Sequence, residues 1–180
     1  MKPFRYCAPL FTLLVFGVLS GCSSTPKSPD VISPIRQALG AAGIKDVSVS
    51  QDRDKGVVTL GGQVPVDEQK SQAQSIATSL ARGQVVANQI AVVAPGVASQ
   101  AKAINADVDK GIGENLDAAL IQNGLNKVIK YQVKNGVITL TGQVNSESVR
   151  SQVTQIAAGV PYQQQVVNEL QVKDQKATSN

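Results

Sequence analysis

Apolar residues along this chain change their spacing in a fixed order, and the order occurs twice. In the second half, Ile112, Leu116 and Leu120 recur at every fourth position, as on one face of a helix. From 128 to 133 apolar and polar residues alternate instead, which is typical of a strand with one buried face. Continued to the end of each half, the pattern predicts a helix, two strands, a second helix and a third strand.

Turn and capping residues mark the boundaries of these elements. Asp54-Lys55-Gly56 in the first half and Lys134-Asn135-Gly136 in the second separate the two adjacent strands, and Asn-Gly is a strong hairpin signal. Ser33, followed by Pro34, is predicted to cap the first helix of the first half. Asn145 is predicted to cap the second helix of the second half.

A sequence repeat shows that the two halves are copies of one unit. Residues 56–64 read GVVTLGGQV and residues 136–144 read GVITLTGQV, an offset of 80 residues, and 15 of the 37 positions from 56 to 92 are identical in the second copy. We therefore predict one domain at 30–92 and a second at 103–172. Residues 93–102, with Pro95 and Gly96, are predicted to be a linker.

The predicted architecture is α/β, of the α+β sandwich kind, in two tandem domains. Each has three strands with one buried face and two helices with one buried stripe, so both helices should cover one face of a three-stranded mixed sheet. The other face must meet solvent, a partner or the sister domain. Gly62 and Gly142, inside strands, indicate a bulge or a close backbone approach. Asn88 and Asn168 are expected to bond backbone groups rather than a ligand.

The amino terminus has the three-part layout of a secretory signal. Lys2 and Arg5 precede an apolar run at 10–19, and small residues follow up to Cys22. The run is shorter than the roughly 20 residues of a membrane-spanning helix. Residues 1–21 are therefore predicted to be a signal peptide, residues 22–29 a tether and residues 173–180 a polar tail.

The residues Leu19-Ser20-Gly21-Cys22 resemble the lipobox of bacterial lipoproteins. The resemblance implies cleavage before Cys22 and acylation of its thiol, which would anchor the protein in a membrane. Ser23 after the cysteine, by similarity to lipoprotein sorting in enterobacteria, implies the outer membrane, with the protein facing the periplasm. A plain signal peptide that happens to end near a cysteine is the alternative.

Composition removes several classes of function. The chain has no histidine, and after processing it has no free thiol, so His- or Cys-based catalysis and the usual zinc site are absent; we expect no metal, no cofactor and no enzyme. From residue 22 on, 15 basic residues face 13 acidic ones with only two aromatic rings, which argues against nucleic-acid binding. The acidic pairs 52/54, 67/68 and 107/109 fall at predicted turns or helix starts, where capping is favoured over a hydrolase site.

The motifs G-V-[VI]-T-L-x-G-Q-V and V-x-N-x-[IL]-x-V, with this order of elements, resemble the BON domain family. The resemblance covers both copies, and a lipobox before two such domains is similar to dual-BON lipoproteins of the Gram-negative outer membrane. It implies a non-enzymatic role in envelope integrity, with anionic phospholipid as a ligand. Membrane attachment through the anchor is the first expected partnership.

Candidate lipid-contact residues lie in the second copy. Lys127, Lys130 and Lys134 can form a basic strip, with Tyr162 at a membrane interface beside it. A merely solvated sheet face is the alternative for these lysines. The second hypothesis for function is a protein-interaction or chaperone-like factor in outer-membrane protein assembly, using the exposed sheet faces.

Overall fold

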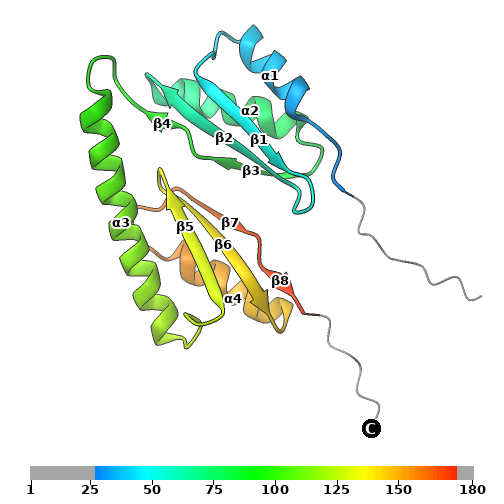
Figure 1. Ribbon diagram of the computed structural model, residues 1–180, viewed down its shortest axis with the longest axis vertical. Coiled ribbons are helices and arrows are strands. Elements are labelled where there is room, and N and C mark those ends of the chain that lie inside the picture. The colour runs from blue at the N-terminus through cyan, green and yellow to red at the C-terminus, as the bar shows by residue number, and fades with distance from the viewer. Residues whose placement is uncertain (1–26, 174–180) are drawn as a thin grey trace, which may run out of the picture.

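The computed structural model describes residues 27–173, which form two α/β domains of one topology (Figure 1). The predicted signal peptide at 1–21, Cys22 and residues 174–180 of the predicted polar tail lie outside the described residues. No helix within 27–173 combines the length and the apolar character that crossing a bilayer would require.

Domain 1 follows the predicted order of elements. It comprises α1 (Ile32–Ala41), β1 (Val47–Asp52), β2 (Val57–Val64), α2 (Asp67–Leu80), β3 (Val85–Asn88) and β4 (Ala91–Val92). β1 pairs with β2 antiparallel, and β3 and then β4 pair with β2 in parallel. The sheet is therefore mixed, with β2 in the centre, and its third strand is divided into two short pieces.

Domain 2 repeats this arrangement. It comprises α3 (Ala98–Gln122), β5 (Ile129–Lys134), β6 (Val137–Val144), α4 (Glu147–Ala158), β7 (Gln165–Asn168) and β8 (Gln171–Val172). β6 is the central strand, antiparallel to β5 and parallel to β7 and β8. The predicted fold class, two tandem α+β domains, is confirmed.

Each domain has its core between its two helices and one face of its sheet. In domain 1, Ile35 and Leu39 of α1 and Ala77 of α2 pack with Val58 and Leu60 of β2, all at most 2% exposed. The equivalent core of domain 2 contains Ile112, Leu116, Ile138, Leu140 and Val153. Because burying one such aliphatic side chain contributes about 1.5–3 kcal/mol, each domain is held mainly by this layer.

An asparagine divides the last strand of each domain. Asn88, only 3% exposed, accepts a hydrogen bond from Ile90 N (3.3 Å) and donates from Nδ2 to Lys70 O (3.2 Å) and Gln74 Oε1 (3.1 Å). Asn168 makes the equivalent three bonds in domain 2. The side chain thus joins the break in the strand to the preceding helix, which confirms the structural role predicted for both asparagines.

A glycine on the central strand allows the first strand to approach closely. Gly62 has φ +102°, and a Cβ there would lie 2.1 Å from Asp46 O. At Gly142, with φ +134°, the corresponding distance to Val128 O is 2.4 Å. The predicted close backbone approach is confirmed at both positions.

Helix capping differs in detail from the sequence prediction. α1 begins at Ile32, one residue before the predicted cap Ser33, and Asp30 Oδ1 accepts a hydrogen bond from Ile32 N (3.0 Å). α4 is capped by Ser146, whose Oγ accepts from Val149 N (3.3 Å), and not by Asn145. A capping side chain accepts from an amide two or three residues later, and Ser146 lies three residues before Val149.

The predicted linker at 93–102 is helical from Ala98 onward, because α3 is 25 residues long. Pro95 and Gly96 end the preceding segment, but Ala98, Ala101 and Ala103 follow at once. Alanine is the strongest helix former, so the helix extends more than two turns beyond the part that contacts the domain 2 core. The acidic residues 107 and 109 therefore lie within a helix and not at its start.

The two domains pack through the sheet faces that the helices leave open. Val57 and Ala87 of domain 1 form one buried cluster with Val137 and Val167 of domain 2. Val137 is the counterpart of Val57 and Val167 of Ala87, at the repeat offset of 80. Both domains thus use the same patch, as in a two-fold interface between identical subunits.

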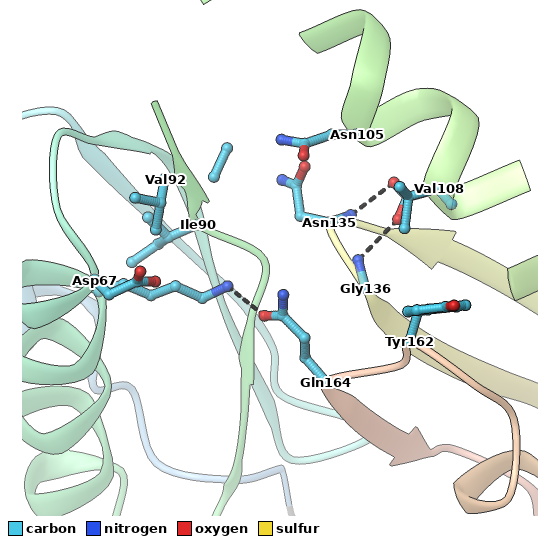
Figure 2. A pocket seen from close by; sticks show the side chains of 12 residues that line it. Asp67, Ile90, Val92, Asn105, Val108, Asn135, Gly136, Tyr162 and Gln164 are labelled. Atoms are coloured by element: carbon cyan, nitrogen blue, oxygen red, sulfur yellow. Dashed lines mark hydrogen bonds between the residues drawn. The ribbon is translucent and has the colours of Figure 1, made fainter. Parts of the chain in front are cut away.

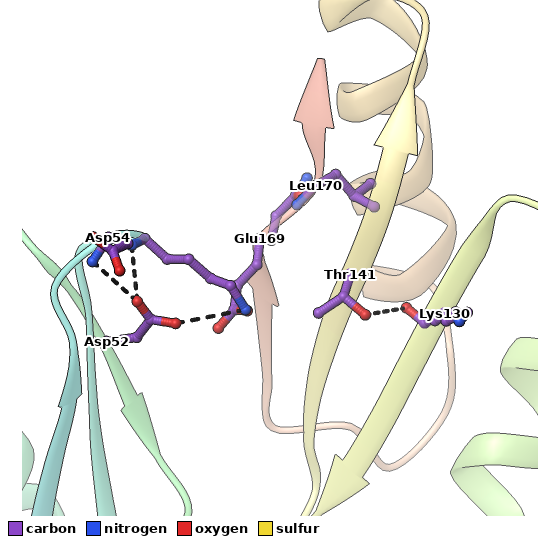
Figure 3. A network of polar contacts seen from close by, with 8 residues as sticks. Asp52, Asp54, Lys130, Thr141, Glu169 and Leu170 are labelled. Atoms are coloured by element: carbon purple, nitrogen blue, oxygen red, sulfur yellow. Dashed lines mark hydrogen bonds and ion pairs between the residues drawn. The ribbon is translucent and has the colours of Figure 1, made fainter. Parts of the chain in front are cut away.

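Polar contacts beside this cluster follow the same pseudo-symmetry. Lys55, at the tip of the β1–β2 hairpin, pairs with Glu169 of domain 2 at 2.5 Å (Figure 3). Asn135, its counterpart, donates from Nδ2 to Gln89 O of domain 1 (2.7 Å), and Gln89 is the counterpart of Glu169. The hydrogen bond to Glu169 raises the pKa of Lys55 above its ordinary value. Each hairpin tip therefore contacts the broken last strand of the other domain.

Residues 27–31, which include the last residues of the predicted tether at 22–29, are bound to domain 1. Ser28 N donates to Arg53 O (2.9 Å), and Arg53 Nε donates back to Ser28 O (2.7 Å). Pro29 O accepts from the side chains of Gln51 (2.7 Å) and Gln84 (3.0 Å). The chain therefore enters domain 1 along its β1–β2 hairpin.

Candidate functional site

The four predicted lipid-contact residues do not form one cluster. Lys130 and Lys134 are exposed on the same side of β5, whereas Lys127 lies in the loop before that strand. Tyr162 follows α4, 83% exposed, and lines a cleft beside Gly136 at the far end of the strand. Because a strand advances about 3.3 Å per residue, Lys127 is some 20 Å from that end. Lys134 and Tyr162 share a region, and Lys127 lies away from it.

The first half of α3 supplies an exposed apolar stripe that the sequence prediction missed. Val97, Ile104 and Val108 are 41%, 62% and 42% exposed. Their spacing of seven and four residues places them on one side of the helix. Of these residues only Val97 falls in the predicted linker at 93–102; Ile104 and Val108 fall in the predicted second domain, but the sequence prediction placed neither of them in a helix. We call Val97, Ile104, Val108 and the neighbouring Tyr162 the α3 surface.

An aspartate fixes α3 to the tip of the β5–β6 hairpin. Asp109 accepts hydrogen bonds from Asn135 N (2.7 Å) and Gly136 N (2.8 Å) (Figure 2). The carboxylate thus satisfies two backbone donors of the turn, and it places Val108 of the helix beside Tyr162. This aspartate has a structural role.

A second acidic residue also stabilises a turn. Asp52 Oδ1 accepts from Asp54 N and Lys55 N, both at 3.0 Å, at the tip of the β1–β2 hairpin (Figure 3). Asp67 and Glu68 occupy the first turn of α2, where negative charge is favoured by the helix dipole. The predicted placement at a turn or a helix start is confirmed for these positions, although neither Asp67 nor Glu68 forms a capping hydrogen bond. Within residues 27–173 no three potential metal ligands lie close enough to hold an ion.

A small cleft between the domains adjoins the α3 surface. Its volume is about 130 Å³. Domain 1 contributes Asp67, Lys70 and the β4 residues, and domain 2 contributes Val108, the hairpin tip and the segment from Tyr162 to Gln164 (Figure 2). Lys70 Nζ donates to Gln164 Oε1 at 2.7 Å. Burial lowers the pKa of Lys70, and the charge of Asp67 opposes that shift.

Comparison with known protein families agrees with this architecture. The BON domain family matches twice, over residues 30–94 and 108–174. The chain belongs to the BON domain family. BON domains are associated with phospholipid binding and envelope proteins, and the family is generally non-catalytic. The second match begins at residue 108, so the first part of α3 precedes it.

Two solved structures are distantly similar to this chain. Two structures of CdsD, a structural protein of the type III secretion system of Chlamydia trachomatis, match with 18% and 17% identity and TM-scores of 0.31 and 0.30. The matches cover 79% and 78% of this chain, and 62% and 66% of those chains. No curated protein matches the chain. Likenesses at these TM-scores carry no argument about function.

Proposed function

We propose that this BON protein is an outer-membrane lipoprotein, anchored at Cys22, that supports envelope integrity by binding phospholipid through the α3 surface. The observation that carries the proposal is the exposed stripe of Val97, Ile104 and Val108 beside Tyr162. Aliphatic side chains that a domain leaves in water gain free energy when a bilayer covers them. A tyrosine has the apolar body and polar tip favoured at a membrane interface.

Basic residues near this surface supply the electrostatic part. Lys102 of α3 and Lys134 at the end of β5 line a second cleft, which contains Asn135 and lies next to the first. A lysine close to an anionic bilayer contributes about 1 kcal/mol of attraction. Lys130 and Lys127 extend the charge along β5, away from the apolar stripe. The strip predicted from sequence is thus proposed to assist the α3 surface and not to form the site.

The acyl anchor is tested by Cys22→Ala. One acyl chain holds a protein on a membrane only marginally and two or three hold it durably, so loss of acylation should move the protein from the membrane fraction to the soluble periplasmic fraction. The measurement is fractionation of cells, together with the mass of the purified wild-type protein. An unmodified Cys22 in the mature wild-type chain would contradict the anchor.

The α3 surface is tested by Ile104→Gln in the chain from residue 23 on, which retains all core residues of both domains. We expect affinity for vesicles containing anionic lipid to fall roughly fivefold. Partial burial of one isoleucine contributes about 1 kcal/mol of binding free energy, which corresponds to this change. The affinity is measured by flotation of the protein with vesicles. Ile121→Gln is the matched control, because Ile121 is 54% exposed on the same helix and lies about 100° around it.

A wild-type chain that binds no vesicle of any composition would overturn the lipid proposal. Equal losses in the two variants would show that general hydrophobicity, and not this surface, causes binding. The alternative, a protein-interaction role through the open sheet faces, finds less support because Val57 and Val137 of those faces are already buried against each other.

A further inference from the structure

The interdomain cleft is lined by one basic and one acidic side chain of α2, which attract each other but form no ion pair. Lys70 forms its hydrogen bond with the neutral amide of Gln164, and no carboxylate lies within ion-pair distance of its Nζ among the described residues. Asp67, one turn earlier on α2, also lines the cleft, and its carboxylate accepts no hydrogen bond within residues 27–173. The cleft thus offers a cationic and an anionic contact at separate positions.

The other charged group of the cleft is already satisfied. Asp109 directs both carboxylate oxygens to the backbone of Asn135 and Gly136, so it is not available to a ligand. Its negative charge nevertheless remains, which leaves Asp67 and Asp109 facing a single lysine. A ligand with only negative charge would gain from Lys70 and be repelled by the two aspartates.

We propose that this cleft binds the phosphoethanolamine headgroup of a phospholipid, with the phosphate on Lys70 and the ammonium on Asp67. Such a headgroup carries both charges two carbons apart and has no net charge. Choline carries no N–H donor, so it could not donate a hydrogen bond to Asp67. The inference rests on the proposed lipid function and adds a headgroup preference to it.

The position of the cleft agrees with a lipid held in a bilayer. Val108 and Tyr162 belong both to its lining and to the α3 surface. A lipid whose tails stay in the membrane could therefore place its headgroup between the domains. Lys70 and Asp67 come from domain 1, and Val108 and Tyr162 from domain 2. The site consequently requires both BON domains in their packed arrangement.

Soluble headgroups provide the first test, because they remove effects of bilayer packing. The chain from residue 23 on is titrated with glycerophosphoethanolamine, glycerophosphocholine and inorganic phosphate while amide chemical shifts are followed. We expect shifts around Lys70, Asp67 and Tyr162 with the first compound at concentrations where the other two cause little change. Equal responses to the ethanolamine and choline compounds would overturn the proposal, as would responses confined to other residues.

Vesicles provide the second test, using phosphatidylcholine alone or with part of it replaced by phosphatidylethanolamine or phosphatidylglycerol. We expect the ethanolamine lipid to improve binding by up to about fivefold, the upper end of the range for one partly exposed charge pair. Asp67→Asn should abolish that gain and improve binding to phosphatidylglycerol, because it removes one repulsive charge. Lys70→Gln should weaken binding to both lipids. Glu68→Gln, in the same helical turn but outside the cleft lining, is the matched control.

The outcomes separate this inference from the function on which it rests. Failure to bind any vesicle would remove the lipid function as a whole. Binding that depends on Ile104 but is the same for choline and ethanolamine lipids would leave the α3 surface intact and overturn the headgroup site. An Asp67→Asn variant that keeps the ethanolamine preference would also overturn it.

Discussion

Gly62→Ala is expected to lower the free energy of unfolding of domain 1 by about 3 kcal/mol or more. A Cβ at this position would lie 2.1 Å from Asp46 O, and φ of +102° is a conformation that alanine rarely adopts. β1 must therefore move away from β2, which breaks ladder bonds at the edge of the core. Small domains have little stability to lose, so most of domain 1 should be unfolded at 37 °C.

Urea unfolding followed by circular dichroism measures this effect. Gly40→Ala is the matched control, because Gly40 lies in α1 without positive φ and has no atom within 4 Å of the place that a Cβ would take. Alanine should stabilise that helix by about 0.5–1 kcal/mol. The prediction is contradicted if the two substitutions change the midpoint in the same direction.

Asn88→Ala is expected to cost about 2–3 kcal/mol, the second largest effect. The side chain is buried and makes three hydrogen bonds, to Ile90 N, Lys70 O and Gln74 Oε1. Its loss leaves the buried Ile90 N–H without a partner, and an unsatisfied buried group costs more than an average hydrogen bond is worth. The break between β3 and β4 would also lose its connection to α2.

The control for this substitution is Asn123→Ala. Asn123 is exposed after α3 and donates one hydrogen bond, to Ala119 O at 2.8 Å. Its replacement should change the free energy of unfolding by no more than about 0.5 kcal/mol. Thermal or urea unfolding compares the two variants, and similar midpoints would refute the role assigned to Asn88.

Local signals were sufficient to predict the domain fold. The alternation around Ile138 and Leu140, the glycine turns and the repeat offset predicted the elements and their packing. The repeat also identified Asn88 and Asn168 as structural residues before any contact was known. These features depend on neighbours within a few residues or on the different hydrophobic periods of strand and helix, which a sequence displays directly.

The candidate site was harder to predict because it depends on how the domains are placed. Pro95 and Gly96 obscured the start of α3, so the sequence prediction identified this helix only from Ile112 on and missed the apolar stripe before it. The packing of Val57 against Val137 and Val167 could have been suspected, since these residues make the open sheet face partly apolar. Lys70 lines a cleft together with residues of domain 2, which are about 40 to 90 residues away in the chain. No local sequence pattern predicts this arrangement.

The bound segment at 27–31 restricts how the protein can stand on a bilayer. An extended chain covers at most about 3.5 Å per residue, so Lys27 can lie no farther than about 17 Å from Cys22. The segment is attached on the side of the molecule away from α3 (Figure 1). An acylated molecule could bring α3 to the same leaflet by detaching residues 27–31, which would about double this reach. Binding of residues 27–31 to domain 1 and binding of α3 to the membrane would then be competing states of one molecule.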